Sequence, residues 1–324
     1  MFSVAFQEIT EQIIEKLAVE AEKITVRGFN PGSPVELSAD LAGMTLPVNL
    51  MANKYCPTDR YTYIYHNKLA KRQLTWASFQ GKTTEKVYFK MLKKFKMKKF
   101  EDISKKGIFE ATKVIGKEEI DEKKVEFEKI KEKIVGYVPT KKDVEIFFEN
   151  LEKLVVFESL IASSIIEYRL SRDPSKSISS YIESAFPFEP ELEIKGGTEI
   201  GFSEKITPDF VFDSKIIGDI KTGEHKPFFE HTLAAYAIAY EKENKKPMNF
   251  GIILNPQFGS SQTTIDYQHA KIVLIDDVMR KAFLYFRNEK LDLIKKGHLP
   301  DTCTKEICQS CCFVKDCSSI REQT

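Results

Sequence analysis

The sequence contains no run of about 18 uncharged apolar residues, the length that a membrane-spanning helix needs. Residues 1–22 carry several glutamates among their apolar positions, a pattern that is typical of an amphipathic helix and not of the apolar core of a signal peptide. No Gly-x-x-x-x-Gly-Lys-Ser/Thr loop is present, so any nucleotide-driven motor would have to be a separate protein. We therefore expect a cytoplasmic protein with no membrane partner.

An excess of charge of one sign is also missing. The chain has 49 basic and 48 acidic residues, a net charge of +1, so its composition gives no indication of a nucleic-acid partner. A local patch such as Lys90–Lys99 would have to provide any path for DNA, although such a run can equally be the solvated face of a helix. The 42% of hydrophobic residues is typical of a soluble globular protein with a full core.

The apolar pattern divides the 324 residues into four regions. The pattern predicts a helical region over residues 1–99 and a charged helical insertion over residues 100–188. It predicts a core of short strands and helices over residues 189–297 and a tail over residues 298–324. The expected fold class is therefore α/β (α+β) rather than a repeated βαβ array. The individual helices are expected at 3–25, within 49–70, from Gly81 to about Lys98, from near Thr140, at about 227–244 and at about 277–296.

The strongest catalytic signal lies in residues 206–223, where Pro208-Asp209 precedes Asp219-Ile220-Lys221. Two β-type segments flank a short polar turn near Asp213–Ser214 and predict a hairpin. A three-residue turn would place Asp209 opposite Asp219, and Lys221 shares a strand face with Asp219 because it lies two residues further on. Adjacent carboxylates need a cation, so we expect Mg²⁺ or Mn²⁺ on Asp209 and Asp219, with Lys221 orienting water or stabilising negative charge.

Cysteine is scarce and unevenly placed. Of six cysteines, five lie within residues 303–317, and Cys56 stands alone far upstream. In a reducing compartment this distribution favours a metal or cluster site over a disulfide scaffold. The spacing of Cys308, Cys311 and Cys317 (C-x₂-C-x₅-C), together with Cys56, gives four thiolates, which are the soft ligands of zinc and of iron–sulfur clusters.

The cofactor expected at these thiolates is a 4Fe-4S cluster, because structural zinc usually has two C-x-x-C pairs and this chain has one. Two cysteines remain spare. Cys312 is adjacent to Cys311 and cannot replace it without changing the spacing, whereas Cys303 could replace Cys56.

Taken together, these motifs resemble the RecB-like iron–sulfur nucleases. The chain is most similar to the CRISPR-associated Cas-four family, in particular to its longer archaeal variant, Csa-one. The likeness runs from the Arg-Gly-Phe-Asn segment at Arg27, through Tyr55–Tyr65, to the cysteine tail, and it is interrupted by residues 100–185. The resemblance implies a RecB-like PD-(D/E)xK nuclease core that a cluster closes by joining both ends of the chain.

The resemblance also implies two further site residues. The family's first motif, a helical Gly-x-x-x-His, corresponds to Gly81-Lys82-Thr83-Thr84-Glu85, so Glu85 would be the third metal ligand, and Glu167 is the rival. A Gln-x-x-x-Tyr pair of RecB-type nucleases corresponds to Thr232 and Tyr236, which would make Tyr236 a catalytic residue. A structural role in packing is the alternative for Tyr236.

The implied activity is metal-dependent cleavage of single-stranded or splayed DNA, as an exonuclease, an endonuclease or both. The implied setting is CRISPR spacer acquisition in antiviral defence, with the integrase formed by Cas-one and Cas-two proteins as a partner. Because Thr232 departs from the family pattern, a catalytically weak DNA-binding scaffold is one alternative. A DNA-repair nuclease that works with a separate helicase is another.

Overall fold

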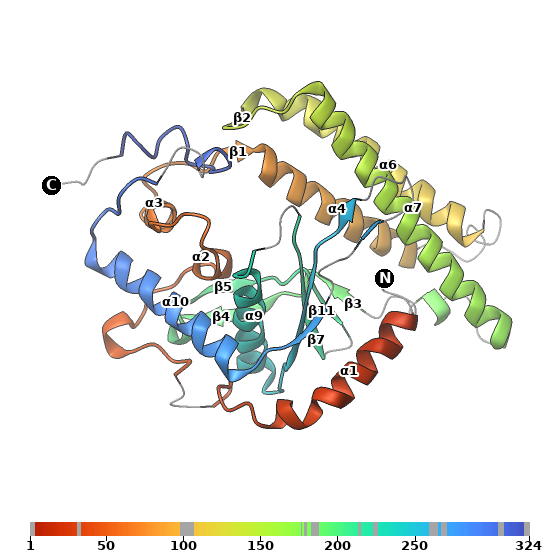
Figure 1. Cartoon of the computed structure of the whole chain (residues 1–324), viewed down its shortest axis with the longest axis horizontal. Coiled ribbons are helices and arrows are strands. Elements are labelled where there is room, and N and C mark those ends of the chain that lie inside the picture. Colours follow the sequence, from red (N-terminus) through yellow and green to blue (C-terminus); the bar gives the residue numbers. More distant parts are fainter. Residues whose placement is uncertain are drawn as a thin grey trace.

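The computed structural model describes residues 4–30, 34–97, 107–175, 177, 180–182, 188–212, 215–222, 226–258, 265–266, 271–303 and 308–320. Within them the chain is a mixed α/β protein (Figure 1). No helix in these ranges is long and apolar enough to cross a membrane. The helices are α1 (Val4–Glu22), α2 (Val48–Ala52), α3 (Arg60–His66), α4 (Trp76–Lys96), α6 (Ile108–Ile130), α7 (Lys141–Arg172), α9 (Phe229–Asn244) and α10 (Asp277–Lys296). The strands are β1 (Leu74–Thr75), β2 (Ile134–Val135), β3 (Phe188–Pro190), β4 (Ile194–Gly197), β5 (Phe202–Ile206), β6 (Phe210–Phe212), β7 (Ile216–Ile220), β8 (Phe250–Leu254), β9 (Gln257–Phe258), β10 (Ile265–Asp266) and β11 (Lys271–Leu274).

A five-stranded sheet forms the centre of the protein, in the order β11-β8-β7-β6-β3. Strands β7 and β8 are parallel and are joined by α9, whereas the other neighbours are antiparallel. All five residues of β8 are buried, and so are the first four of β7, as expected for strands covered on both faces. The sheet lies between α9 and α10 on one side and α4, α6 and α7 on the other (Figure 1).

The two faces of the sheet contribute to two different hydrophobic clusters. Phe210, Phe212 and Ile216 pack with α4, α6 and α7. Val211 and Ile217, which alternate with them, pack with α9 and α10. Because side chains alternate along a strand, Asp209 and Asp219 belong to the same set of positions as Val211 and Ile217 and face α9.

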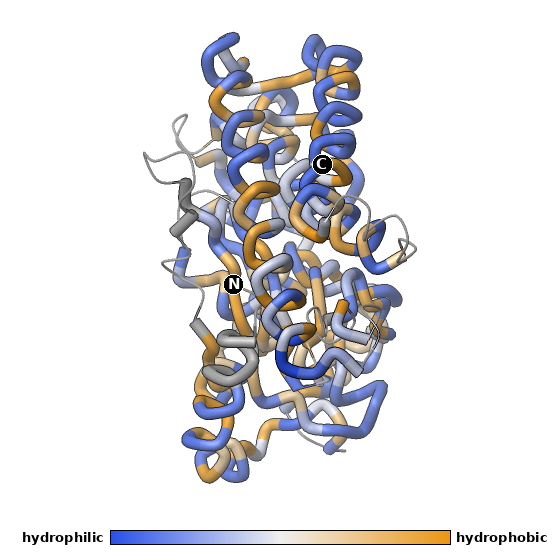
Figure 2. The backbone as a smooth tube through the Cα atoms, turned by 90° about the vertical axis from the view of Figure 1, so that its right-hand side faces the viewer, coloured by the Kyte–Doolittle hydropathy of each residue, from blue (hydrophilic) through white to orange (hydrophobic). Residues whose placement is uncertain are grey.

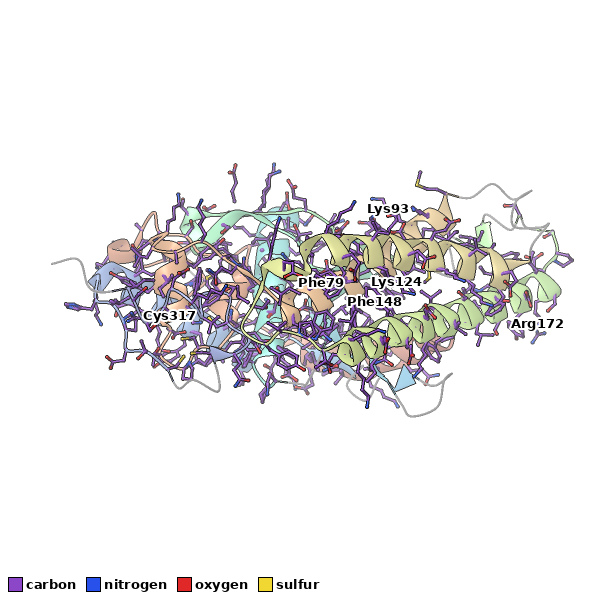
Figure 3. All side chains as sticks on the ribbon, turned by 90° about the horizontal axis from the view of Figure 1, so that it is seen from above. Phe79, Lys93, Lys124, Phe148, Arg172 and Cys317 are labelled. Atoms are coloured by element: carbon purple, nitrogen blue, oxygen red, sulfur yellow. The ribbon has the colours of Figure 1, made fainter. Side chains whose placement is uncertain are left out.

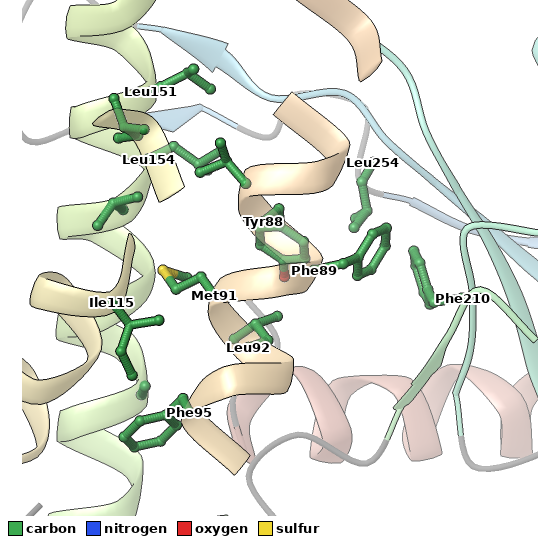
Figure 4. Packing of buried hydrophobic residues seen from close by; sticks show 14 of the residues in the cluster. Tyr88, Phe89, Met91, Leu92, Phe95, Ile115, Leu151, Leu154, Phe210 and Leu254 are labelled. Atoms are coloured by element: carbon green, nitrogen blue, oxygen red, sulfur yellow. The ribbon is translucent and has the colours of Figure 1, made fainter. Parts of the chain in front are cut away.

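Helix α4 packs between the sheet and the pair formed by α6 and α7. Figure 4 shows its residues Tyr88 to Phe95 lying between Leu151 and Leu154 on one side and Phe210 on the other. Hydrophobic and hydrophilic residues alternate along these helices, as the amphipathic pattern requires (Figure 2). The helical content expected for residues 100–188 is therefore present as α6 and α7, which pack extensively on each other.

The helix that we expected from Gly81 to about Lys98 begins five residues earlier, at Trp76, so this boundary was wrong. The reason is a capping box: Thr75 Oγ1 accepts a hydrogen bond from Ser78 N (3.2 Å), and Ser78 Oγ accepts one from Thr75 N (3.1 Å). Gly81 is therefore an interior residue of α4. The described part of the helix ends at Lys96, and residues 98–100 lie outside the described residues.

The other expected elements agree closely with the structure. Helix α10 spans Asp277–Lys296, as expected, because Asp276 caps its start and Gly297 ends it. Helix α9 begins at Phe229, two residues after the expected start, and the β-type runs after residue 190 are strands β4 to β7. The expected turn at residues 213–214 lies outside the described residues.

A buried ion-pair network joins the N-terminal segment to α9 and α10. Glu241 is fully buried and accepts hydrogen bonds from Arg27 (2.8 Å) and from both terminal nitrogens of Arg280 (2.8 and 3.0 Å). The backbone N–H of Gly28 also donates to Glu241 (2.9 Å). A buried carboxylate needs this degree of pairing, so the Arg-Gly-Phe-Asn segment has a clear structural role.

Candidate functional site

Strands β6 and β7 form the hairpin that carries the candidate catalytic residues. The register pairs Phe210 with Gly218, so Asp209 and Asp219 lie one step further along the same ladder. The backbone N–H of Ile220 donates to Asp209 Oδ2 at 2.5 Å. The structure thus places Asp209 beside Asp219, as the sequence pattern predicts.

The ammonium of Lys221 lies against the buried carboxylate of Asp219. Lys221 Nζ is 2.5 Å from Asp219 Oδ2, and only 2% of the Asp219 side chain is exposed. Lys221 itself lies just beyond β7, where its N–H donates to Leu254 O at 2.8 Å and continues the pairing with β8. The backbone of Lys221 is therefore held by the sheet, and its ammonium is held by the carboxylate of Asp219.

Glycine at position 218 allows the hairpin to close. A Cβ atom at this position would lie 2.0 Å from the ring of Phe210 on the paired strand, which no side chain could tolerate without movement. The Phe210 ring occupies this space and continues onto Phe89 of α4, at 6.3 Å between ring centroids. This close packing sets the distance between the strands that carry the two aspartates.

Helix α4 brings Glu85 to the same place. Gly81, four residues earlier and therefore on the same face of the helix, lies so close to the residue after Lys221 that a Cβ would be 3.3 Å from Thr222 Oγ1. The negative charge of Asp219 contributes to a raised Glu85 pKa. The rival residue, Glu167, lies on α7, where its carboxylate accepts a hydrogen bond from Ser163 (2.8 Å). The geometry therefore favours Glu85.

The pKa shifts show that three acidic groups share this region. Burial raises the pKa of Asp209 well above its usual value, and the charges of Asp219 and Glu85 raise it further. Burial, followed by Asp219, raises the pKa of Glu85. Burial by itself lowers the pKa of Lys221, but the two aspartates outweigh it and the net shift is upward. One ammonium against three carboxylates leaves an excess of negative charge that a cation would neutralise.

Two more residues, a tyrosine and a glutamate, lie near these carboxylates only because of the tertiary structure. The side chain of Tyr236 on α9 is buried, and after burial itself the charges of Asp219, Asp209 and Glu85 raise its pKa. Glu191, which the sequence pattern did not reveal, donates its N–H to Asp209 O (3.0 Å), and its charge also raises the pKa of Glu85. Thr232, one helical turn before Tyr236, is buried as well.

The donor set fits a hard divalent cation, because carboxylate oxygens are the ligands that Mg²⁺ and Mn²⁺ prefer. Among the described residues, however, no three His, Cys, Asp or Glu side chains already have the arrangement of a metal site. The ammonium of Lys221 lies directly against one carboxylate oxygen of Asp219. A cation that bound Asp219 through this oxygen would have to displace Lys221 by a short movement.

The cysteine tail folds back onto the segment that carries Cys56. Cys303 Sγ lies 2.9 Å from Cys308 Sγ. Burial raises the pKa of Cys303 to about 12 and that of Cys311 to about 11, and the charge of Cys56 contributes to both shifts. Cys56 also contributes, after burial, to a raised pKa of Cys317. These thiols therefore lie near enough to affect one another's pKa values, with Cys303 among them, but among the described residues no three of them have the arrangement of a metal site.

The sixth cysteine, Cys312, belongs to a small hydrophobic cluster with Ile64 and Phe313. It is 8% exposed, and its thiol affects the pKa of Tyr61 and of Arg72. Its side chain therefore packs on α3 as part of the tail's anchor. This placement agrees with the expectation that Cys312 is a spare cysteine.

Two buried basic residues hold the segments that carry the thiols. Arg60 donates to the carbonyl oxygens of Cys317 (2.9 Å), Ile320 (2.7 Å) and Pro300, and it is 5% exposed. Lys290 of α10 donates to the carbonyl oxygens of Leu50 (2.7 Å) and Asn53 (2.5 Å) and pairs with Asp59 (3.0 Å). Sequence reasoning missed both residues, since a single basic residue within a helix gives no signal of what it binds.

The basic run of α4 has a structural partner. Lys90 and Lys94 both form ion pairs with Glu119 of α6, a glutamate whose side chain is fully buried. Part of this run therefore supports the contact between two helices.

Comparison with known proteins places the chain in a family. The family model described as CRISPR-associated exonuclease Csa1 matches residues 5–321. The chain belongs to the Csa1 family. A protein of Saccharolobus solfataricus that is described as CRISPR-associated exonuclease Csa1 is 27% identical over 138 residues, which cover 43% of this chain and 46% of that protein. The matched segment thus spans about half the length of this Csa1 relative.

A crystal structure of a protein from Eubacterium rectale, provisionally described as an exonuclease, is similar over 80% of this chain and 84% of that protein. The TM-score is 0.44 and the sequence identity is 14%, which is too low for the likeness to indicate how the Csa1 chain works. Membership of the Csa1 family therefore rests on the match over almost the whole sequence.

Proposed function

We propose that this protein is a metal-dependent DNA nuclease with a RecB-like core. The observation that carries the proposal is the convergence of Asp209, Asp219 and Lys221 at the end of β7, beside Glu85. Asp209 and Glu85 have pKa values that burial and then the charge of Asp219 raise, and such groups next to an ammonium are typical of a functional site. Membership of a family described as CRISPR-associated exonucleases supports the same reading.

In this proposal Asp209, Asp219 and Glu85 bind Mg²⁺ or Mn²⁺. When bound, such an ion supplies Lewis-acid charge and makes a bound water more acidic. Lys221 lies close enough to the carboxylates to donate a hydrogen bond to the attacking water or to a phosphate oxygen that gains negative charge. The hydroxyl of Tyr236 stays protonated, because burial and three nearby carboxylates raise its pKa, and it can therefore donate a hydrogen bond at the site but cannot act as a base.

We further propose that the thiols hold a 4Fe-4S cluster. Cys56, Cys308, Cys311 and Cys317 are the proposed ligands, and the closeness of Cys303 to Cys308 makes Cys303 the candidate to replace one of them. Cys311 and Cys317 pack against the small apolar cluster of Ile64 and Phe313, which suits a cluster with a structural role. Such a cluster would join the segment of Cys56 to that of Cys308, which are separated by about 250 residues of chain.

The proposed substrate is single-stranded or splayed DNA, which the enzyme would trim as an exonuclease, an endonuclease or both. The proposed setting is CRISPR spacer acquisition, where the product would pass to an integrase formed by Cas-one and Cas-two proteins. The description of the family supports the CRISPR setting. No feature of the described residues identifies the integrase, so this partner rests on the resemblance alone.

The test is cleavage of end-labelled single-stranded DNA, with each end blocked in turn, in Mn²⁺, Mg²⁺ and no metal. Asp219→Asn and Lys221→Met should each lower the rate on the order of a thousandfold, since each removes a charge at the reacting phosphate. Asp292→Asn is the matched control, because Asp292 forms an equally short ion pair with Lys296 (2.5 Å) on the exposed face of α10. Wild-type rates in both site variants would refute the assignment.

A second candidate, a DNA-binding scaffold with weak or no catalysis, is favoured by one observation. Thr232 occupies the position where RecB-type nucleases have glutamine, and it is buried one turn from Tyr236. A scaffold would bind DNA without cleaving it in either metal. If Thr232→Gln then produced cleavage, the missing amide would be the reason for the weak activity.

A further inference from the structure

Two groups of aromatic side chains, joined by neighbouring residues of the chain, are together called the aromatic platform: Tyr55, Phe228, His231, Tyr285 and Phe286. The rings of Tyr55 and Phe228 meet edge to face, with centroids 4.9 Å apart. Tyr55 is 55% exposed. Exposed tyrosine next to other aromatic rings is typical of binding surfaces and uncommon elsewhere.

The second half of the platform is centred on Phe286 of α10. Its ring lies 4.8 Å from the ring of His231 and 5.9 Å from that of Tyr285, which is 60% exposed. The ammonium of Lys54 sits 3.8 Å above the Phe286 ring. Lys54 precedes Tyr55 in the chain, and His231 lies three residues after Phe228, so the two halves are neighbours along two separate segments of the chain.

The platform carries charges of both signs, and its positive charge lies among the rings. Burial, and after it the charge of Lys54, lowers the pKa of His231, which therefore remains neutral near pH 7. The hydroxyl of Tyr285 donates to Glu289 on the outer edge, which fixes the orientation of this ring. Lys54 is thus the charge that lies directly among the aromatic rings.

The platform leads directly to the candidate site. The ammonium of Lys221 lies 5.7 Å from the ring centroid of Phe229, and this ring in turn packs on Phe228 at 5.2 Å. The charges of Lys221 and Asp219 both act on the hydroxyl of Tyr55. A ligand lying on the platform would therefore have one end at the carboxylates.

We propose that the aromatic platform binds a single strand of nucleic acid by stacking bases on Tyr55 and Tyr285, its two exposed rings, while Lys54 contacts the phosphates. This inference rests on the proposed nuclease function and specifies how the substrate reaches the site. Stacking requires unpaired bases, because the bases of a duplex already stack on one another and present only their edges. The platform therefore selects a single strand over a duplex and tolerates any base sequence.

The experiment measures binding by fluorescence anisotropy, using the full chain with its cofactors and no added divalent cation, so that cleavage cannot occur. The probes are a labelled oligothymidylate of about 15 nucleotides, the size that such surfaces cover, and an abasic strand of the same length. Tyr55→Ala and Tyr285→Ala should each weaken binding of oligothymidylate about tenfold. Both variants should bind the abasic strand as the wild type does, since it carries the phosphates without the bases.

Tyr168→Ala is the matched control. Tyr168 on α7 is also 55% exposed and also packs with a cation, Arg172 at 5.6 Å, but it lies far from the cysteine region (Figure 3 labels Arg172 and Cys317 toward opposite ends). This variant should bind both probes normally. Tyr55→Phe keeps the ring and should retain wild-type affinity, which separates stacking from any role of the hydroxyl.

Two results would overturn the platform: wild-type affinity for oligothymidylate in both alanine variants, or an equal loss for both probes, which would mean that the rings only support the fold. Failure of the platform differs from failure of the proposed function. A wild type that binds the strand but cleaves nothing in Mn²⁺ contradicts the nuclease and supports the platform. A wild type that cleaves DNA, together with alanine variants that bind oligothymidylate as the wild type does, supports the nuclease and contradicts the platform.

Discussion

The protein contains two polar centres that are held in very different ways. The carboxylate site is built on adjacent strands, where the β6–β7 register and Gly218 set the positions of the aspartates. The thiol site is assembled from segments that are distant in sequence and meet through side-chain contacts such as Arg60 to the carbonyl of Cys317. The comparison shows that the geometry of the carboxylate site follows from backbone pairing, whereas that of the thiol site depends on a few long-range side-chain contacts.

The largest expected effect concerns the thiols themselves. Cys308→Ser should remove iron and the broad absorbance near about 400 nm that thiolate–iron charge transfer gives. The free energy of unfolding should fall by about 4 kcal/mol, as when a cross-link that closes a long loop is lost. Cys312→Ser is the control, because this cysteine packs on Ile64 and Phe313, and it should retain iron. Iron content per chain and thermal melting measure both. Equal iron loss in the two variants would contradict the ligand assignment.

The next prediction concerns the hairpin of the carboxylate site. Gly218→Ala should lower the free energy of unfolding by about 3 kcal/mol, because the new methyl group would collide with the Phe210 ring. Nuclease activity should fall, while iron content stays normal. Ile217→Val, at the fully buried neighbouring position, is the control and should cost about 1 kcal/mol. Adding Phe210→Leu to Gly218→Ala should restore part of the stability in urea unfolding. No restoration would mean that the collision is not the cause.

A smaller effect is expected at the contacts that hold the tail. Arg60→Met should cost about 2 kcal/mol, because three carbonyl oxygens lose a charged donor. Limited proteolysis should then cut within residues 308–320 while the hairpin stays protected. Lys295→Met breaks only an exposed pair with Asp40 (3.1 Å) and should change stability by less than about 0.5 kcal/mol. A tail that stays resistant in the Arg60 variant would show that the thiols alone hold it.

The smallest effect involves Asp277, which links residues 25 and 26 to the start of α10. Its carboxylate accepts hydrogen bonds from Thr25 N (3.0 Å) and Val26 N (2.9 Å). Burial alone would raise the Asp277 pKa, but a hydrogen bond from the Thr25 hydroxyl (2.5 Å), together with these two backbone hydrogen bonds, outweighs burial and lowers it. The stabilisation is therefore present above the unfolded pKa of about 3.9 and is lost as the pH falls through the lower folded value.

Asp277→Asn should accordingly cost about 1 kcal/mol at pH 6. In urea unfolding, the difference between wild type and variant should shrink as the pH is lowered toward 3. A difference that stays constant over this range would mean that the charge of Asp277 does not matter. The result would also show whether the long-range contacts of α10 depend on ionisation.

The hairpin and α10 could be predicted because their signals are local. Alternation of side chains fixes which face Asp209 and Asp219 share, and a helix that starts after Asp276 and ends at Gly297 carries both of its boundaries in the sequence. The start of α4 was missed although its signal is also local. The capping box uses Ser78 where glutamate or glutamine is usual, so the sequence pattern indicates a start at Gly81 instead of Trp76.

The neighbours of the site could not be predicted, since they meet only after folding. Tyr55 reaches the carboxylates through the position of α2 and the loop after it, and Glu191 does so from the turn between β3 and β4. The contacts of Lys290 with Leu50 and Asn53 bring together positions more than 230 residues apart, which no period or motif encodes. Pairings of this kind depend on the packing of the whole core.

The contact between the Cys56 segment and the tail has a consequence for how the protein is made. During synthesis Cys56 leaves the ribosome early, and Cys308 follows only after some 250 further residues. Translation adds about 5–20 residues per second. For many seconds the first thiol lacks the tail thiols, and the β6–β7 hairpin leaves the ribosome before they do. If these thiols hold the proposed cluster, a chain interrupted between Lys221 and Cys308 would contain the acidic pair but could not bind the cluster, and iron content would report on completed translation.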